Sequence, residues 1–295
     1  MRYSDLDKSA LQAELTRVQK DYEALRGYKL NLNLTRGKPE TAQLALSNDM
    51  FRTLDDGDFN IDGMDTRNYG ELAGLPSCRK LFADLLYCKP EEVILGNNAS
   101  LQLMYDLIAK AYTHGLKNSV RPWAKEEKIK FLSPFPGYDR HFNVSKSFGM
   151  ELVPVPMDEK GPNMDLVEEL IKDASVKGMW CVPKYSNPDG YVYPLETCQR
   201  IAAMKPAAPD FALMWDNAYC IHTFEGEDIP FPDMIGICRE AGNPDLVYEF
   251  ASTSKVTLAG AGVSCMAASV ENIKYILSLM TFQTIGPNKV NELMH

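Results

Sequence analysis

The stretch LVYEFASTSKVTLAGAG (246–262) decides the fold of this chain. It opens with a short apolar run, 246–250, which is typical of a β-strand buried on both faces of a parallel sheet. The run stops abruptly at small hydroxyl residues and a lysine, Lys255. Ligands bind at the carboxyl ends of the strands in such sheets, so this change from apolar to polar residues predicts the edge of a binding site.

The same strand pattern recurs along the chain, with helical patterns between the strands. Further apolar runs lie at 93–95, 129–133, 151–155, 178–182, 211–215 and 263–268, and helical periodicity at 100–113, 164–174 and 194–204. Strands separated by helical crossovers indicate parallel pairing. We therefore predict an α/β fold, with a mostly parallel seven-stranded sheet and helices on both of its faces.

An amphipathic helix precedes this sheet. Apolar residues recur at steps of four and three through 4–26, and Gly27 ends the pattern. An extended piece, NLNLTRGKPE (31–40), follows it. We expect an N-terminal arm over 1–45 and a ligand-binding domain over 46–295.

The composition of the chain excludes several classes of protein. The 295 residues are 45% hydrophobic and 24% charged, as in ordinary globular proteins, and the net charge of −9 argues against nucleic acid or an anionic membrane surface as partner. No apolar run approaches the ~18 residues of a membrane span. Seven cysteines without a Cys-x-x-Cys pair favour reduced thiols in the cytoplasm, and four histidines without ligand spacing predict no metal site.

Lys255 lies between small hydroxyl residues, Ser252 and Ser254, directly after a buried strand. This makes it a poor surface lysine, and a buried lysine loses its charge readily, which makes its amine nucleophilic enough for a Schiff base. The two hydroxyls are short enough to reach a phosphate. The alternative is a loop lysine that happens to follow serine and threonine.

Asp216 ends another very apolar strand, in WDNAY (215–219). An unpaired carboxylate there is costly, so Asp216 needs a cationic partner. A protonated pyridine nitrogen is one such partner, and the ion pair would keep the ring an electron sink. Tyr219 lies three residues on and could point its phenol toward the ring's 3-oxygen. The alternative for Asp216 is a buried carboxylate that caps a helix.

Three further polar clusters follow strands. Asn187 in SNPDG (186–190) could donate to the same ring oxygen, although this sequence is also an ordinary turn. GNNAS (96–100) begins a helix, where backbone N–H groups bind anions. In SPFPGY (133–138) an aromatic side chain could cover a flat heterocycle, or simply pack.

In this order, the clusters resemble the fold-type I, class I aminotransferases, most closely a divergent aspartate-aminotransferase-like group. The resemblance runs from about residue 30 to the end of the chain. The matching residues are Tyr69 in RNYGELAGLPSCRKLF, Asn98-Ala99-Ser100, Phe135 in PFPGY, Asn187-Pro188, Asp216 and Tyr219 in DNAY, and Lys255 in STSK. Each motif is weak alone, but the ordered set is specific.

The resemblance implies pyridoxal 5′-phosphate (PLP) as cofactor. Lys255 would hold it covalently and move the substrate's α-proton, Asp216 would keep the ring nitrogen protonated, and Asn187 and Tyr219 would bond the 3-oxygen. The remaining contacts expected from the family are Phe135, or else Tyr138, on the ring face, and Asn98, Ala99, Ser100, Ser252 and Ser254 around the phosphate.

The resemblance also implies a homodimer, because Tyr69 matches a tyrosine that reaches the phosphate of the neighbouring subunit. Gly37 matches the glycine of a segment that covers the substrate, and Asn187 would also contact the substrate. The family commonly has an arginine about eight residues after the lysine, but no arginine follows Lys255 here. The family's small C-terminal domain is also missing, which suggests a truncated form.

The implied reaction is transamination between an amino acid, expected to be aspartate or glutamate, and a 2-oxo acid such as 2-oxoglutarate. Two alternatives stay open at this point. One is a PLP-dependent lyase or decarboxylase of the same fold, because fold does not fix the reaction. The other is a non-catalytic PLP-sensing regulatory domain, in which the pocket acts as a ligand switch.

Overall fold

The structure is a computed structural model that describes residues 2–31, 39–55, 57–224, 226–227, 229 and 231–295. The chain divides into two units, Met1–Glu40 and Thr41–His295, and each is described by itself.

In its described residues, the first unit has one long helix, α1 (Lys8–Gly27), preceded by a short 3₁₀ turn, η1 (Tyr3–Asp5). Asp7 caps α1, since its carboxylate accepts a hydrogen bond from the backbone N–H of Ala10 at 2.8 Å. The predicted helix is therefore present and ends at the predicted Gly27, but it begins at Lys8 and not at residue 4, because Asp7 caps it and residues 3–5 form a separate 3₁₀ turn.

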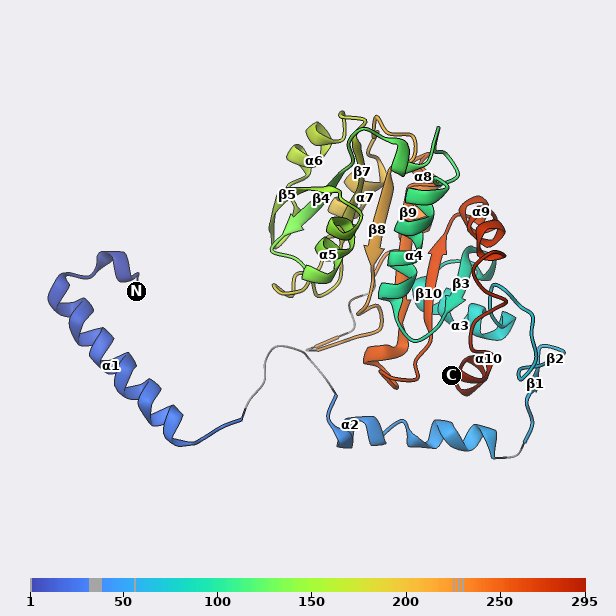
Figure 1. Cartoon of the computed structure of the whole chain (residues 1–295). Helices are drawn as coiled ribbons and strands as arrows, with labels where there is room; N and C mark the ends of the chain where they lie inside the picture. The colour runs from blue at the N-terminus through green and yellow to red at the C-terminus, as the bar shows by residue number, and fades with distance from the viewer. Residues whose placement is uncertain (1, 32–38, 56, 225, 228, 230) are drawn as a thin grey trace. The chain divides into compact units, whose positions relative to one another are not determined.

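The second unit is built on an eight-stranded sheet with the order β3-β10-β9-β8-β7-β4-β5-β6 (Figure 1). The strands are β3 (Val93–Gly96), β4 (Lys130–Phe135), β5 (Glu151–Asp158), β6 (Gly161–Pro162), β7 (Val176–Cys181), β8 (Ala212–Asp216), β9 (Val247–Ser252) and β10 (Ser264–Ala268). The neighbours β5, β4, β7, β8 and β9 pair in parallel, whereas β10 and β6 are antiparallel to their neighbours. The prediction of a mostly parallel sheet is confirmed; the eighth strand, β6, has too few residues for a recognisable apolar run.

Helices cover both faces of the sheet, as predicted (Figure 1). On the first face lie α3 (Pro76–Leu86), α6 (Met164–Leu170), α7 (Leu195–Ala202) and α8 (Met234–Glu240), and on the second α4 (Ser100–Thr113), α5 (Asp139–Ser147) and α9 (Val270–Met280). Alternation along each strand divides the core accordingly: in β8, Trp215 packs on the first face and Met214 on the second.

The smaller elements lie outside the main layers. They are α2 (Thr41–Ala45), η2 (Asn48–Leu54), β1 (Asn60–Ile61) paired with β2 (Met64–Asp65), η3 (Pro90–Glu92), η4 (Trp123–Lys125), η5 (Thr253–Lys255) and α10 (Lys289–Met294). Only η5, which follows β9, bears directly on the predicted site.

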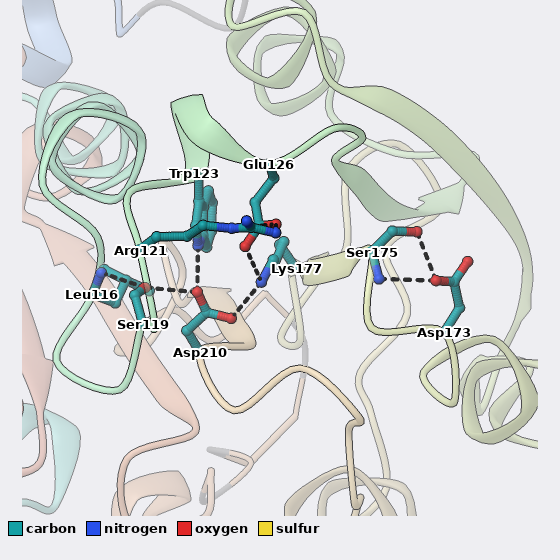
Figure 2. Close-up of polar contacts among 9 residues, drawn as sticks. All are labelled: Leu116, Ser119, Arg121, Trp123, Glu126, Asp173, Ser175, Lys177 and Asp210. Atoms are coloured by element: carbon teal, nitrogen blue, oxygen red, sulfur yellow. Dashed lines mark hydrogen bonds and ion pairs between the residues drawn. The ribbon is translucent and has the colours of Figure 1, made fainter.

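A buried polar cluster fixes the amino ends of β7 and β8, and Figure 2 shows its bonds. Asp210 accepts hydrogen bonds from Ser119 Oγ (2.6 Å), Trp123 Nε1 (2.8 Å) and Lys177 Nζ (2.8 Å). We call these four residues the Asp210 cluster. Every bond draws a loop or strand toward β8, so the cluster anchors the end of the sheet opposite the predicted site.

Candidate active site

Asp216 is the last residue of β8 and lies at the carboxyl edge of the sheet, on the second face. Only 5% of its surface is exposed. One carboxylate oxygen, Oδ2, lies 2.9 Å from Nε2 of His141, which α5 supplies from the same face. Since an ionised carboxylate can only accept, Nε2 carries the proton and donates.

The imidazole of His141 is fixed by its own packing. It stacks on Trp180 of β7, with ring centres 4.5 Å apart and planes 8° from parallel, and meets Tyr138 edge to face. A ring held in this way can approach Asp216 only through Nε2. The orientation of the Asp216 carboxylate is therefore set by a rigid donor.

The other oxygen of Asp216, Oδ1, is buried and has no hydrogen-bond partner. Leaving a buried acceptor unpaired typically costs about 1–3 kcal/mol. A protonated pyridine nitrogen supplies what this atom lacks, because it brings both an N–H donor and a positive charge. Asp216 therefore fits the ring of PLP.

Lys255 is exposed, which corrects the expectation of a buried lysine. The reason is local: β9 ends at Ser252, and one 3₁₀ turn carries Lys255 beyond the end of the strand. Its Nζ lies 4.7 Å from the centre of the Tyr219 ring. The structure thus brings Lys255 and Tyr219 together.

Tyr219 is half-buried, and burial raises the pKa of its phenol, with a further rise from the negative charge of Asp216. The phenol consequently keeps its proton at neutral pH and can donate a hydrogen bond. Tyr219 also shares an open pocket of about 540 Å³ with Asn187. The pocket is lined by Tyr185, Ser186, Asn187, Pro188, Gly190, Tyr219, Phe224 and Ile229.

Asn187 connects this pocket to the Asp216 side of the site. A second, narrower hollow is lined by Asn187 together with Tyr138 and His141. Tyr138 therefore lies beside the histidine that holds Asp216. The predicted ring-contacting residues Asn187, Tyr219 and Tyr138 surround one region at the carboxyl edge.

The residues expected around a phosphate lie at neighbouring strand ends. Ala99 is the N-cap residue of α4, and Ser100 is its first residue. Two hydrogen bonds join the start of α4 to the loop that carries Lys255. Ser254 Oγ donates to the carbonyl oxygen of Asn98 at 2.5 Å, and Asn98 Nδ2 donates to the carbonyl oxygen of Ala259 at 3.3 Å. Ser252 is the last residue of β9, the strand that leads into the loop with Lys255.

Comparisons with known proteins decide the family. The family model described as aspartate amino-transferase matches residues 6–295. A putative aminotransferase of Mycolicibacterium smegmatis is 48% identical over 100% of this chain and 70% of its own length. An aspartate aminotransferase of Corynebacterium glutamicum is 46% identical over 94% of this chain and 65% of its own length.

This chain belongs to the aspartate aminotransferase family. A solved structure of an aspartate transaminase from Corynebacterium glutamicum has the same fold, with a TM-score of 0.95 and 45% identity over 99% of this chain and 69% of that one. The chain therefore spans about two thirds of the length of these relatives. The expected fold and enzyme class, an aminotransferase, are confirmed.

Two predicted residues of this aminotransferase are largely exposed. Phe135 at the end of β4 is 64% exposed and Tyr69 is 83% exposed. Gly37 lies outside the described residues. Within the described part of the chain, no helix is both long and apolar enough to cross a bilayer.

His141 was not among the residues predicted for the site. Its side chain is buried, and its hydrogen-bond partner is Asp216. The available signal was its position in SPFPGYDRH (133–141), one of the polar clusters that follow strands. His141 is the third residue of α5, the helix that follows β4, and of the first three residues of this helix it is the buried one.

Proposed function

We propose that this aminotransferase binds PLP at the carboxyl edge of its sheet and transfers an amino group from an amino acid to a 2-oxo acid. Aspartate or glutamate is the proposed donor and 2-oxoglutarate the proposed acceptor. The observation that carries the proposal is the buried, unpartnered Oδ1 of Asp216 at the end of β8, followed in the chain by Tyr219, whose ring centre lies 4.7 Å from Lys255 Nζ. The name of the Corynebacterium glutamicum relative supports aspartate.

When bound, PLP supplies an electron sink for the charge that develops at the substrate's α-carbon. The part of Asp216 in this chemistry is to keep the ring nitrogen protonated. His141 helps because its Nε2–H donates to Oδ2 and holds the carboxylate in one orientation. Oδ1 is then left as an acceptor for the ring N–H.

Lys255 would hold the cofactor covalently through Nζ and, once displaced by the substrate amine, move the proton at the α-carbon. Its exposed position suits this task, because a lysine in the core could not meet a substrate arriving from solvent. Tyr219, a neutral phenol 4.7 Å from Nζ, would donate to the 3-oxygen of the ring, with Asn187 from the same pocket. Asn187 would also contact the substrate.

The phosphate would lie at the start of α4. This helix has 14 residues, and its first N–H groups together with Ala99 and Ser100 form an anion site. Ser252 would add a hydroxyl donor. Asn98 and Ser254 would complete the site by fixing the helix start to the lysine loop, as their hydrogen bond indicates.

Further contacts belong to the proposal. Phe135 or Tyr138 would cover the ring face, Gly37 would belong to a segment covering the substrate, and Tyr69 would reach the phosphate of a second copy in a homodimer. The domain division proposed for these roles is an arm over 1–45 and a PLP-binding domain over 46–295. The lyase and ligand-sensing alternatives are not favoured, because the relatives are named aminotransferases.

The test is to mix the purified chain with PLP, reduce with borohydride, and locate the modified residue by peptide mass spectrometry. We expect a single modification at Lys255 and its loss in Lys255→Ala. Lys184 is the matched internal control, because it is a buried lysine at the same edge whose Nζ donates to the carbonyl oxygen of Cys220. A modification at Lys184 with Lys255 untouched would show that the site is assigned wrongly.

The reaction class is tested by adding aspartate, glutamate or alanine to the unreduced PLP-loaded chain. Transamination converts the bound cofactor to its amine form, with loss of the long-wavelength absorbance and release of the matching 2-oxo acid. We expect aspartate and glutamate to act faster than alanine. Release of carbon dioxide, or of an alkene acid with retention of the absorbance, would indicate a lyase instead.

A further inference from the structure

A second carboxylic side chain lies beneath the strand end that carries Asp216. Glu249 is in β9, directly opposite Trp215 of β8, and only 1% of its surface is exposed. It points to the first face of the sheet, like its strand neighbours Val247 and Ala251. The proposed PLP contacts do not include it.

The partner of Glu249 is Asn217, the residue that follows Asp216. Asn217 Nδ2 donates to Glu249 Oε1 at 2.8 Å, and the backbone N–H of Asn217 donates to the carbonyl oxygen of Phe250 at 2.8 Å. Asn217 thus fastens the end of β8 to β9 twice, once through the main chain and once through the side chain. Because side chains alternate along a strand, this fastening lies on the face opposite the Asp216 carboxylate.

Two more atoms of this pair are buried and unpartnered, namely Glu249 Oε2 and Asn217 Oδ1. As a carboxylate, Glu249 would bury a charge with a donor to only one of its two oxygens, which is costly. As an acid, it keeps Oε1 as the acceptor for Asn217 and places no charge in the core. The burial and the single donor therefore favour the neutral acid at this position.

The surroundings of Glu249 also favour the neutral form. Burial raises its pKa to about 8, the hydrogen bond from Asn217 lowers it in part, and the charge of Asp233 raises it. The negative charge of an ionised Glu249 would also act on five thiols, each from a different part of the chain: Cys88, Cys198, Cys220, Cys238 and Cys265. The nearest cation of α8, Arg239, pairs with Glu92 instead.

We propose that Glu249 and Asn217 form an uncharged acid–amide pair that positions Asp216 for the pyridine ring of the cofactor. The inference rests on the proposed PLP site. Glu249 is a positioning residue, because it acts on the ring only through Asn217 and the end of β8. Its neutral state lets the pair sit in an apolar, thiol-rich core without an unpaired charge.

The test uses the full chain and four proteins: wild type, Glu249→Gln, Glu249→Leu and Cys238→Ala. PLP affinity is measured by absorbance titration at pH 7 and pH 9, and the melting temperature is measured without PLP. Glu249→Gln keeps both a donor and an acceptor for Asn217 at every pH. Cys238→Ala is the matched control, because Cys238 is fully buried in the same core.

We expect Glu249→Leu to weaken PLP binding about tenfold at pH 7, since it leaves the Asn217 amide unpaired. Cys238→Ala is expected to lower the melting temperature without changing the affinity. The acid is lost as the pH rises through about 8, so wild-type affinity should fall relative to that of Glu249→Gln between pH 7 and pH 9. Glu249→Gln should match wild type at pH 7.

Unchanged affinity in Glu249→Leu, or an equal loss in Cys238→Ala, would overturn the positioning role. If Glu249→Leu does not fold, the wild-type and Glu249→Gln profiles decide: parallel profiles overturn the inference and diverging ones support it. A wild-type chain that takes up no PLP at Lys255 would instead refute the proposed function itself. The two failures are therefore distinguishable.

Discussion

Two buried aspartates lie at opposite ends of one strand and are treated very differently by their surroundings. Asp210, just before β8, receives three side-chain donors from Ser119, Trp123 and Lys177 (Figure 2). Asp216, at the other end, receives one from His141 and keeps one oxygen unpartnered. The difference separates a carboxylate that serves the fold from one that is left ready for a ligand.

The energetics of the two sites follow from this count. A buried ion pair with additional donors, as at Asp210, is stable as it stands, and removing one member leaves the other charge uncompensated. A buried acceptor without a donor, as at Asp216, makes the free protein less stable until a ligand supplies the donor. Replacing aspartate with asparagine should consequently lower the reaction rate but not the stability at Asp216, and lower the stability but not the PLP affinity at Asp210.

The largest effect is expected for Asp216→Asn. An amide cannot hold a protonated ring nitrogen by charge, so the transamination rate should fall by about 10³-fold, the upper range for removing one preorganised electrostatic group. The melting temperature of the cofactor-free chain should change little. The measurement is the rate of half-transamination with aspartate, beside a melting curve without PLP. A rate within tenfold of wild type would contradict the role given to Asp216.

The second effect is expected for Asp210→Asn, which is the same chemical change just before the start of β8. It removes the negative charge that compensates buried Lys177, and the free energy of unfolding should fall by about 3 kcal/mol. The other carboxylate near Lys177 is Glu126, at 3.3 Å, which limits the loss. PLP affinity should be unchanged. Denaturant unfolding measures the loss of stability, and absorbance titration measures the PLP affinity. Lost PLP affinity with unchanged stability would show that Asp210 serves the ligand and not the fold.

The strand pattern allowed the fold and the carboxyl-edge residues to be predicted from sequence. Strands such as β8 are short apolar runs that end in polar residues, and these signals are local. β6 carries no such signal, and the exposure of Lys255 depends on a 3₁₀ turn that nothing in its flanking residues specifies.

The pairings within the site could not be predicted, because they join distant segments. His141 and Asp216 are brought together by a helix packing on the second face, and Glu249 meets Asn217 through the β8–β9 register. The residues that flank each of these side chains in the sequence do not indicate its partner. The Asp210 cluster was missed for the same reason, since its members come from three separate parts of the chain.

A smaller effect is expected for His141→Phe, which keeps an aromatic ring on Trp180 but removes the donor to Asp216. Hydrogen bonds to charged groups contribute roughly 1.5–3 kcal/mol, so PLP affinity should weaken at least about tenfold. The change should also reduce the fraction of cofactor with a protonated ring, which is visible in the absorbance spectrum. Wild-type affinity and spectrum in the folded variant would show that the bond to His141 does not support Asp216.

The smallest effect is expected for Ser119→Ala, which performs at Asp210 the operation that His141→Phe performs at Asp216. The Asp210 carboxylate keeps Trp123 and Lys177 as donors, although the backbone N–H of Leu116 loses its acceptor, the Ser119 hydroxyl. The free energy of unfolding should fall by only about 1 kcal/mol, or roughly 2–4 °C in melting temperature, with PLP affinity unchanged. Asp210 keeps two donors in Ser119→Ala, whereas Asp216 keeps none in His141→Phe. If the loss of unfolding free energy in Ser119→Ala exceeded the loss of PLP-binding free energy in His141→Phe, the number of donors would not separate the two carboxylates.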